Sequence, residues 1–310
     1  MTFLGPVLTS TLLFGLVAWG VGGHRLTPPG LRTVGWVDNT PMLPGVPSRI
    51  ASATLASDEM IIALSGAAPL QAVTKIADDP RISNITREVK GIPYRIDGLD
   101  PEKILAMGPD LTVVARYTRR DAVLQLEESG LTVLRSPAVE DVEDVKKNAL
   151  LLGRIMDAGP GAETMVGEMD ALLEDVRRRV RGRPRLRVLY YTNGGYTAGK
   201  GSIFSQLLEV AGGLNTSEEA GVVGHGTLTQ EVALTLDPDV IFVSGYKSSA
   251  KVRDMPAAEE LAQDPAWAHV RAVQAGRVYT LPGNHLICIS HHLVKAAEDM
   301  ARVLHPECYE

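Results

Sequence analysis

The sequence lacks the short motifs that mark the common enzyme classes. It contains no G-x-S-x-G, no H-E-x-x-H and no C-x-x-C, and no G-x-G-x-x-G follows the first strand expected in either half of the chain. These motifs provide a nucleophile, a zinc site, a redox pair or a dinucleotide-binding loop. Their absence argues against a chelatase, a hydrolase and a dehydrogenase, so we expect a protein that is not an enzyme.

Cysteine is also scarce. The two that occur, Cys288 and Cys308, are separated by a stretch with helical spacing from Ser290 to Leu304. At ~1.5 Å per residue this helix is about 20 Å long, and the few residues after it cannot easily reach back. We therefore expect two unpaired thiols, even in an oxidising compartment, where a disulfide is otherwise common.

An excess of positive charge is missing as well. The formal net charge is −6, and the one basic run, Arg177 to Arg187, contains no aromatic residue. Surfaces that bind nucleic acids combine clustered Lys and Arg with aromatic side chains that stack on bases. We therefore expect no nucleic-acid partner, and we interpret the basic run as the solvated end of a helix.

The stretch GGYTAGKGS, Gly194 to Ser202, lacks one residue of a phosphate-binding loop. It lies between a strand-like run and a helical pattern, and Gly194, Gly199 and Lys200 have the spacing of that motif. The Ser or Thr that ligates Mg²⁺ has to follow the Lys directly. Gly201 occupies that position, so the sequence does not predict ATP binding.

Charged residues are absent from the N-terminal stretch Phe3 to Gly23, which is rich in Leu and Val. About 20 apolar residues are enough to span a bilayer. Residues 1–23 are therefore predicted to be a signal peptide or an uncleaved N-terminal anchor, and no Cys near their end offers a lipid attachment site. Residues 24–47 hold five of the 19 prolines and are predicted to be a tether.

The remaining chain is long enough for two domains. Residues 48–139 and residues 185–310 each alternate strand-like and helix-like patterns, which predicts parallel sheets with helices on both faces. Residues 140–184 carry no strand pattern. Their second half repeats apolar residues at helical spacing: Met165, Met169, Leu172, Leu173, Val176 and Val180. The sequence thus predicts an α/β fold of two Rossmann-like lobes joined by a single long helix.

Two stretches, one in each half, share a pattern. DPEKILAMGPDLTVV (Asp100 to Val114) and TQEVALTLDPDVIFV (Thr229 to Val243) both run from a Glu through a helical turn to Pro-Asp and a strand. Pro-Asp is explained by the turn, because Pro cannot continue a helix. Glu102 and Glu231 lie in the first turn of their helices, where a carboxylate offsets the positive helix end. From the residues alone, a structural role and a functional role are equally open.

Together these features resemble the substrate-binding proteins of ABC importers, in the family that captures iron-siderophores, haem and cobalamin. The resemblance covers about residues 48 to 305, and four stretches carry it: RIASATLASDEMIIAL, DPEKILAMGPDLTVV, GGYTAGKGSIFSQLLEVAGGLN and PAWAHVRAVQAGRVYTLPG. It implies a periplasmic monomer without a cofactor that delivers its ligand to a membrane permease driven by a separate ATPase. In this family a surface Glu from each lobe docks onto the permease, and Glu102 and Glu231 occupy the matching positions.

The resemblance also places the ligand between the lobes, at loops that leave the carboxyl ends of the strands. Candidate ligand-binding residues in the first lobe are Thr54, Leu55, Tyr94, Arg116, Tyr117 and Arg119. Candidates in the second lobe are Asn193, Tyr196, His225, Tyr246, Asn284 and His285. His291 and His292 are neighbours on a predicted helix, where side chains point apart, so they are not expected to form a metal pair.

Phenol, imidazole and guanidinium groups suit an anionic metal chelate. Fe³⁺ accepts phenolate, and haem iron and corrinoid cobalt accept imidazole or tyrosinate. Tyr94, His225 and His285 are therefore candidate metal ligands. The loop composition favours a ferric siderophore as the ligand; cobalamin and haem are the alternatives within the same transport role, and a ligand-sensing module of the same fold is the alternative without transport.

Overall fold

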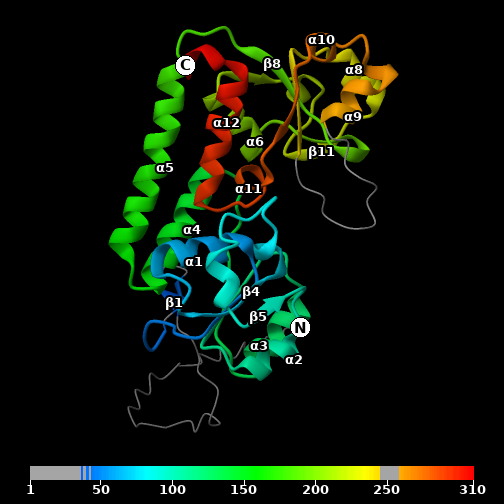
Figure 1. Ribbon diagram of the computed structural model, residues 1–310. Helices are drawn as coiled ribbons and strands as arrows, with labels where there is room; N and C mark the ends of the chain where they lie inside the picture. The colour runs from blue at the N-terminus through cyan, green and yellow to red at the C-terminus, as the bar shows by residue number, and fades with distance from the viewer. Residues whose placement is uncertain (1–35, 38–39, 42, 245–257) are drawn as a thin grey trace, which may run out of the picture.

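The computed structural model describes residues 36–37, 40–41, 43–244 and 258–310 (Figure 1). The predicted signal segment, most of the predicted tether and Tyr246 lie outside these residues. Within the tether, strands β1 (Trp36–Val37) and β2 (Thr40–Pro41) pair in an antiparallel manner. Across the described ranges, no helix has both the length and the apolar character needed to cross a membrane.

Lobe one, as we call the first half of the fold, is built on a five-stranded parallel sheet. Its strands are β3 (Ile50–Ser52), β4 (Leu70–Thr74), β5 (Tyr94–Ile96), β6 (Leu111–Val114) and β7 (Val133–Arg135). Their order is β5-β4-β3-β6-β7, so the chain reverses its direction of winding between β3 and β6. The helices of this lobe are α1 (Leu55–Ser65), α2 (Pro101–Met107), α3 (Arg120–Glu128) and the 3-10 helices η1 (Lys75–Asp78) and η2 (Glu88–Gly91).

Lobe two, the second half, repeats this plan with a four-stranded parallel sheet. Its strands are β8 (Leu186–Tyr190), β10 (Gly213–Asn215), β12 (Val240–Ser244) and β13 (Val278–Leu281), in the order β10-β8-β12-β13. A separate antiparallel pair consists of β9 (Tyr196–Ala198) and β11 (His225–Thr227). The α-helices are α6 (Ile203–Val210), α7 (Thr216–Glu219), α8 (Gln230–Thr235), α9 (Ala258–Gln263), α10 (Arg271–Gln274), α11 (Gly283–Leu286) and α12 (Lys295–Leu304). The 3-10 helices are η3 (Asn193–Gly195), η4 (Pro265–Trp267), η5 (His291–Val294) and η6 (Pro306–Cys308).

The predicted long helix between the lobes is confirmed. α4 (Val142–Ile155) is followed by α5 (Gly159–Val180), which runs along one side of the molecule from lobe one to lobe two (Figure 1). The corner between them is tight, because a Cβ added at Gly153 would stand 2.4 Å from the Cβ of Ala162. Glycine is therefore required where α4 meets the start of α5.

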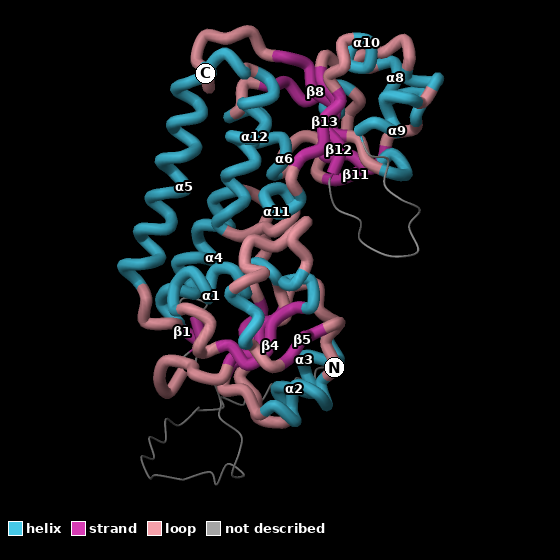
Figure 2. The backbone as a smooth tube through the Cα atoms, viewed as in Figure 1, coloured by secondary structure: helices cyan, strands magenta, loops and turns pink. Residues whose placement is uncertain are grey.

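The predicted α/β fold of two lobes with helices on both faces of each sheet is also confirmed. In lobe two, α6 and α12 cover one face, and α8 and α9 lie on the other (Figure 2). The largest apolar cluster runs from lobe one, for example Met60, through α4 and α5 to Phe242 and Met300 in lobe two. Because this core is continuous across the connection, the lobes are held stiffly relative to one another.

The repeated Pro-Asp pattern has the same structural role in both lobes. In lobe one, the Asp110 carboxylate accepts hydrogen bonds from the N–H groups of Ser48 and Arg49, and the Asp110 N–H donates to the Arg49 carbonyl over 2.9 Å. In lobe two, the Asp239 carboxylate accepts from the Arg187 N–H over 2.9 Å, and the Asp239 N–H donates to the Arg187 carbonyl. Each Asp thus ties the start of one central strand to its neighbour.

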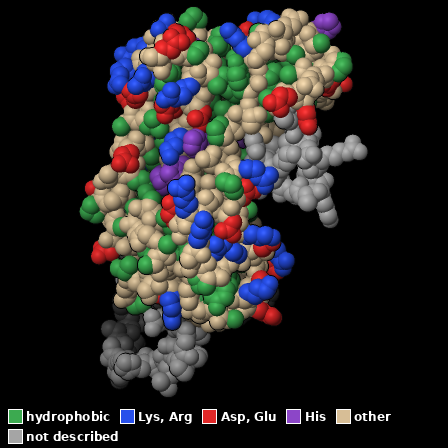
Figure 3. Space-filling view, viewed as in Figure 1, with side chains coloured by type: hydrophobic (Ala, Val, Ile, Leu, Met, Phe, Trp, Pro, Cys, Tyr) green, Lys and Arg blue, Asp and Glu red, His purple; other side chains and the backbone are tan. Residues whose placement is uncertain are grey.

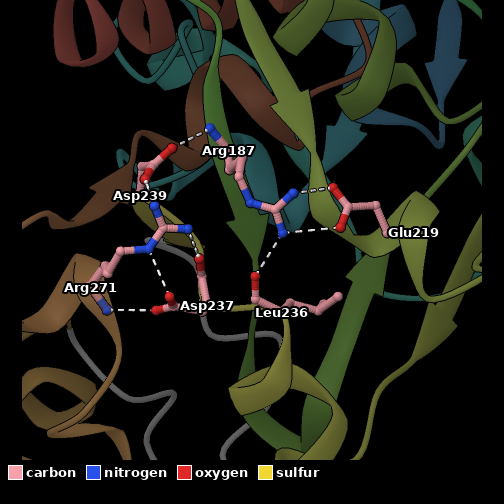
Figure 4. Close-up of polar contacts among 6 residues, drawn as sticks. All are labelled: Arg187, Glu219, Leu236, Asp237, Asp239 and Arg271. Carbon is pink, nitrogen blue, oxygen red and sulfur yellow. Dashed lines mark hydrogen bonds and ion pairs between the residues drawn. The ribbon is translucent and has the colours of Figure 1, made fainter.

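Arg187 corrects one expectation about the basic run. Arg177 to Arg179 do end helix α5, but Arg187 lies in strand β8. Its guanidinium donates to the Glu219 carboxylate and the Leu236 carbonyl, as Figure 4 shows. The last part of the run therefore joins elements of lobe two and is not a solvated helix end.

The two cysteines are not joined. Cys288 is buried and Cys308 is partly exposed, and both are free thiols. The helical elements η5 and α12 lie between them, where the spacing of apolar residues predicted a helix.

Candidate functional site

A pocket of about 600 Å³ lies at the carboxyl edge of the lobe-one sheet, where the strand order reverses. Reversal points of this kind leave a crevice between loops that turn in opposite directions. The walls come from the segments after β3, β6 and β7, from α4, and from residues Ile287–Ile289 of lobe two. The pocket is therefore bounded by both halves of the chain.

Four of the predicted ligand-binding residues line this pocket: Thr54, Leu55, Arg116 and Tyr117. They do so because each lies two or three residues past the end of a central strand, β3 or β6. The Thr54 hydroxyl caps α1 by accepting a hydrogen bond from the Ser57 N–H over 3.1 Å. Arg116 is exposed and forms no ion pair with a described residue, so its guanidinium is available to a ligand. Tyr117 is 92% exposed.

Most of the pocket wall is apolar, and sequence reasoning missed this part. These apolar side chains are not among the candidate ligand-binding residues: Met60, Ile82, Leu134, Val139, Leu151, Leu152, Ile287, Cys288 and Ile289. Asn148 of α4 adds an amide. No signal in the sequence separates these residues from ordinary core residues, because apolar periodicity is the same in both cases.

Tyr94 and Arg119 do not line the pocket in the described structure. Tyr94 was expected in a loop after a strand, but it begins strand β5, opposite Ala72 of β4, and is 47% exposed. Arg119 precedes α3, and its guanidinium pairs with the neighbouring carboxylate of Asp121. Both positions depend on where a short element begins, which is the least certain feature of a sequence-based prediction.

In lobe two, the fold brings two predicted residues together. The Tyr196 hydroxyl lies 2.8 Å from Nδ1 of His225, and the two rings stack with centroids 5.7 Å apart. The pairing of β9 with β11 causes this contact, since it aligns His225 with Ala198, two residues beyond Tyr196. Burial raises the pKa of Tyr196 above its ordinary value. The phenol is therefore protonated at neutral pH, and it shares one hydrogen bond with the imidazole.

The other lobe-two candidates have different surroundings. Asn284 exchanges two hydrogen bonds with Asn84 of lobe one, and Nδ1 of His285 lies 2.6 Å from the Asp299 carboxylate. Neither residue lines the pocket. Asn193 belongs to η3 after strand β8, and its side chain lies outside the described part of the chain, as does the whole of Tyr246.

The rings of His291 and His292 lie close together, with centroids 3.9 Å apart, although neighbouring side chains were expected to point apart. Both residues lie at the start of the 3-10 helix η5, directly after its cap Ser290. Burial lowers the pKa of His291 to about 4 and that of His292 to about 3, so both are neutral at pH 7. Over the described residues, no group of three or more His, Cys, Asp and Glu side chains could hold a metal ion.

The glycine-rich loop has no free cradle for a phosphate. The N–H groups of Gly199 and Lys200 already donate to the carbonyls of Gly224 and Val222. A Cβ at Gly199 would stand 2.1 Å from the Val222 carbonyl oxygen. Gly199 therefore permits the close approach of residues 222–224, and Ser202 caps helix α6. The loop therefore contributes to the packing of lobe two. A phosphate-binding loop would instead present unpaired N–H groups to its ligand.

Glu102 and Glu231 are both exposed in the first turn of a short helix, α2 and α8 respectively. Backbone and Thr229 hydrogen bonds hold the pKa of Glu231 below its ordinary value. Both helices lie on the side of the molecule away from α5 (Figure 1). On the same side, the surface is hollowed between the two lobes (Figure 3).

Comparison with known proteins gives concordant results. The profile of the family described as periplasmic binding protein matches residues 50–285. A cobalamin-binding protein of Halobacterium salinarum is 27% identical over 209 residues, which cover 66% of this chain and 55% of the relative. The chain thus spans about half the length of that relative. An uncharacterised ABC transporter substrate-binding lipoprotein of Bacillus subtilis is 24% identical, over 72% of this chain and 71% of the relative.

Among solved structures, the periplasmic heme-binding protein RhuT from Roseiflexus sp. RS-1 superposes with a TM-score of 0.69 at 20% identity. The match covers 84% of this chain and 99% of that structure. At this identity the likeness shows a common fold and does not identify a ligand.

Proposed function

Because the chain belongs to the periplasmic binding protein family, we propose that it is the substrate-binding protein of an ABC importer and that its ligand is a corrinoid. The pocket at the carboxyl edge of lobe one carries this proposal. Its volume of about 600 Å³ lies in the range of small-molecule sites, and its wall is largely apolar with few polar groups. The similarity to a cobalamin-binding protein supports the same ligand class.

The choice of a corrinoid over haem follows from the metal ligands that the pocket offers. Haem iron takes an axial His, Cys, Met or Tyr from the protein, whereas cobalamin carries its own axial base. The described lining residues include no His, and the side chain of Met60 is packed in the apolar core with 1% exposed. The thiol of Cys288 has a pKa raised to about 12 by burial, so it stays protonated. Tyr117 is at the surface, 92% exposed. The pocket therefore binds its ligand mainly through apolar contacts and hydrogen bonds. A corrinoid, which carries amide groups, can make both.

A second candidate ligand is a ferric chelate, the ligand that the loop composition favoured. The Tyr196–His225 pair supports it, because phenol and imidazole are adjacent in lobe two. Fe³⁺ accepts phenolate and imidazole ligands once the phenol has lost its proton. This candidate places the metal at lobe two, away from the apolar wall.

Titration with cyanocobalamin and with hemin distinguishes these ligands. We expect saturable heat with cyanocobalamin in calorimetry and no ligand-field change in the hemin spectrum. The proposal is wrong if hemin gives the Soret shift of a protein-ligated haem while cyanocobalamin gives no heat. A ferric siderophore analogue whose charge-transfer band changes in wild type, but not in Tyr196→Phe, would instead favour the second candidate.

Two neighbouring arginines provide a matched test of the pocket. Arg116→Ala is expected to raise the Kd for cyanocobalamin by roughly 10- to 100-fold, because hydrogen bonds from a charged group stabilise a complex by about 1.5–3 kcal/mol. Arg119→Ala removes the same charge three residues away, outside the pocket, and is expected to leave the Kd within about twofold. Calorimetry on both variants measures the difference, and equal effects would place the ligand elsewhere.

A further inference from the structure

A buried carboxylate joins the two lobes behind the pocket. Glu59 of α1 is fully buried. Its Oε1 accepts hydrogen bonds from the Asn84 N–H over 2.8 Å and from Asn84 Nδ2 over 3.0 Å, and its Oε2 accepts one from the Ser290 hydroxyl. Burial raises the pKa of Glu59 while these donors oppose the rise. A buried carboxylate is costly unless such partners surround it, so the three donors and the acceptor depend on one another.

A second link lies beside the first. Asn84 Nδ2 donates to the Asn284 carbonyl over 2.7 Å, and Asn284 Nδ2 donates to Asn84 Oδ1 over 2.9 Å. Glu59 and Asn84 belong to lobe one, whereas Asn284 and Ser290 belong to the segment from α11 to η5. We call these four residues the inter-lobe network. It connects positions 200 to 231 residues apart in the sequence.

The residues enclosed by this network form a wall of the pocket. Ile287, Cys288 and Ile289 line the pocket, and Ser290 follows them directly. Ile289 has a φ of 50°, a left-handed conformation that is strained for a β-branched residue. Such a conformation persists only where the surroundings over-determine it. Asn284 and Ser290 hold the segment on either side of the strained residue.

We propose that Glu59 is a positioning residue for ligand binding, which holds the Ile287–Ile289 wall of the pocket in its strained conformation through Ser290 and Asn84. The part of this inference that concerns ligand affinity rests on the proposed function of the pocket. The conformation of the wall does not depend on that function, because Ser290 and Asn84 hold the segment whether or not a ligand binds. Loss of the Ser290 hydroxyl or of the Glu59 carboxylate leaves the other group buried and without its partner, and the Ile287–Ile289 wall then opens.

The thiol of Cys288 reports on the wall without any ligand. Cys288 is 2% exposed, and its side chain lies between the pocket and the Ser290 hydroxyl, 3.5 Å from its sulfur. In a Cys308→Ser background, Cys288 is the one thiol left in the chain. We expect a thiol-reactive probe such as Ellman's reagent to label it at least about tenfold faster in Glu59→Ala and in Ser290→Ala, because local opening controls access.

Two further variants make this test specific. Ser290→Thr retains the hydroxyl and the η5 cap, so it is expected to restore slow labelling. Val123→Ala weakens the separate apolar cluster of lobe one, on the other face of its sheet, and controls for a general loss of stability. Labelling of Ser290→Ala at the wild-type rate, or an equal acceleration in Val123→Ala, would overturn the proposal even if Glu59→Ala does not fold.

The effect of the network on ligand affinity is measured with cyanocobalamin. Ser290→Ala is expected to raise its Kd roughly tenfold, and Ser290→Thr is expected to bind like wild type. An unchanged Kd in Ser290→Ala, with labelling accelerated, would show that the network positions the wall but that the wall does not contact this ligand, which overturns the ligand-binding role of Glu59. If wild type itself fails to bind cyanocobalamin, the corrinoid proposal fails, while the labelling rates still decide whether Glu59 holds the wall.

Discussion

Replacing Glu102 and Glu231 together with alanine is expected to abolish ligand uptake by cells that contain the cognate permease, while the Kd of the purified protein for its ligand is unchanged. Both carboxylates are exposed, lie on helices on the same side of the molecule and are absent from the pocket wall (Figure 1). The permease would then lose one charge-assisted contact to each lobe. Such pairs lose about 2–5 kcal/mol when one partner is truncated, so loss of both contacts prevents docking.

Folding should be almost unaffected by this double substitution. Each Glu stabilises its helix end by only about 0.3–1 kcal/mol, and Asp100 and Thr229 continue to cap α2 and α8. Glu128→Ala with Glu259→Ala is the matched control, since these are exposed carboxylates of the same two lobes. Uptake of cyanocobalamin into cells and calorimetry on the purified variants are the two measurements. Weaker ligand binding by the double variant, or normal uptake, would show that the two residues are not the docking pair.

Raising the pH from 5 to 8 is expected to reduce the free energy of unfolding by about 3 kcal/mol through Asp58 alone. This residue of α1 is fully buried and accepts a hydrogen bond from the N–H of Thr74, a pocket-lining residue, over 3.0 Å. Its Oδ1 is buried without a hydrogen-bond partner in the described residues. Burial raises the pKa of Asp58 to about 7, from 3.8 for the free side chain.

The direction of the effect follows from proton binding. Between pH 3.8 and about 7, folded Asp58 retains a proton that the unfolded chain has released, so raising the pH favours unfolding. The slope is about 1.4 kcal/mol per pH unit and disappears above pH 7, where both states are ionised. The stability contributed by the protonated carboxyl is therefore present at low pH and lost as the pH rises.

Urea unfolding of wild type and Asp58→Asn at pH 5, 6, 7 and 8 measures this contribution. The stability of Asp58→Asn relative to wild type is expected to rise by about 3 kcal/mol over this range, because the amide does not ionise. Asp121→Asn is the control: the Arg119 guanidinium holds the pKa of Asp121 at about 2, so its difference from wild type should not depend on pH. A constant difference for Asp58→Asn as well would show that its carboxyl is already ionised in the folded protein at pH 5.

Much of the fold was predictable because local patterns determine local elements. The apolar run LQAVT coincides with β4, and the stripe from Met165 to Val180 lies on α5. The strands that were missed are short: β1 and β2 have two residues each, and β5, β9, β10 and β11 have three. A three-residue strand has too few residues for an alternating pattern, and its conformation depends on pairing with a distant partner.

The site was predictable only in part. Thr54, Leu55, Arg116 and Tyr117 line the pocket because they lie just past the ends of central strands, a position that the alternating strand and helix pattern identifies. Asn284 and His285 were named for the same cleft, but their side chains bond to Asn84 and to Asp299. Their partners are 200 and 14 residues away, so no local pattern could reveal that these groups are already occupied.

The sequence by itself determined the alternation of strands and helices, the long connecting helix and the repeated Glu and Pro-Asp pattern, since these depend on residues close together in the chain. Only the tertiary structure decided that Ile287 to Ile289 form a wall of the lobe-one pocket and that Glu59 meets Ser290 behind it. Contacts between such distant residues are formed by packing of the two lobes. Periodicity records which face of an element is buried, but not which surface will cover it.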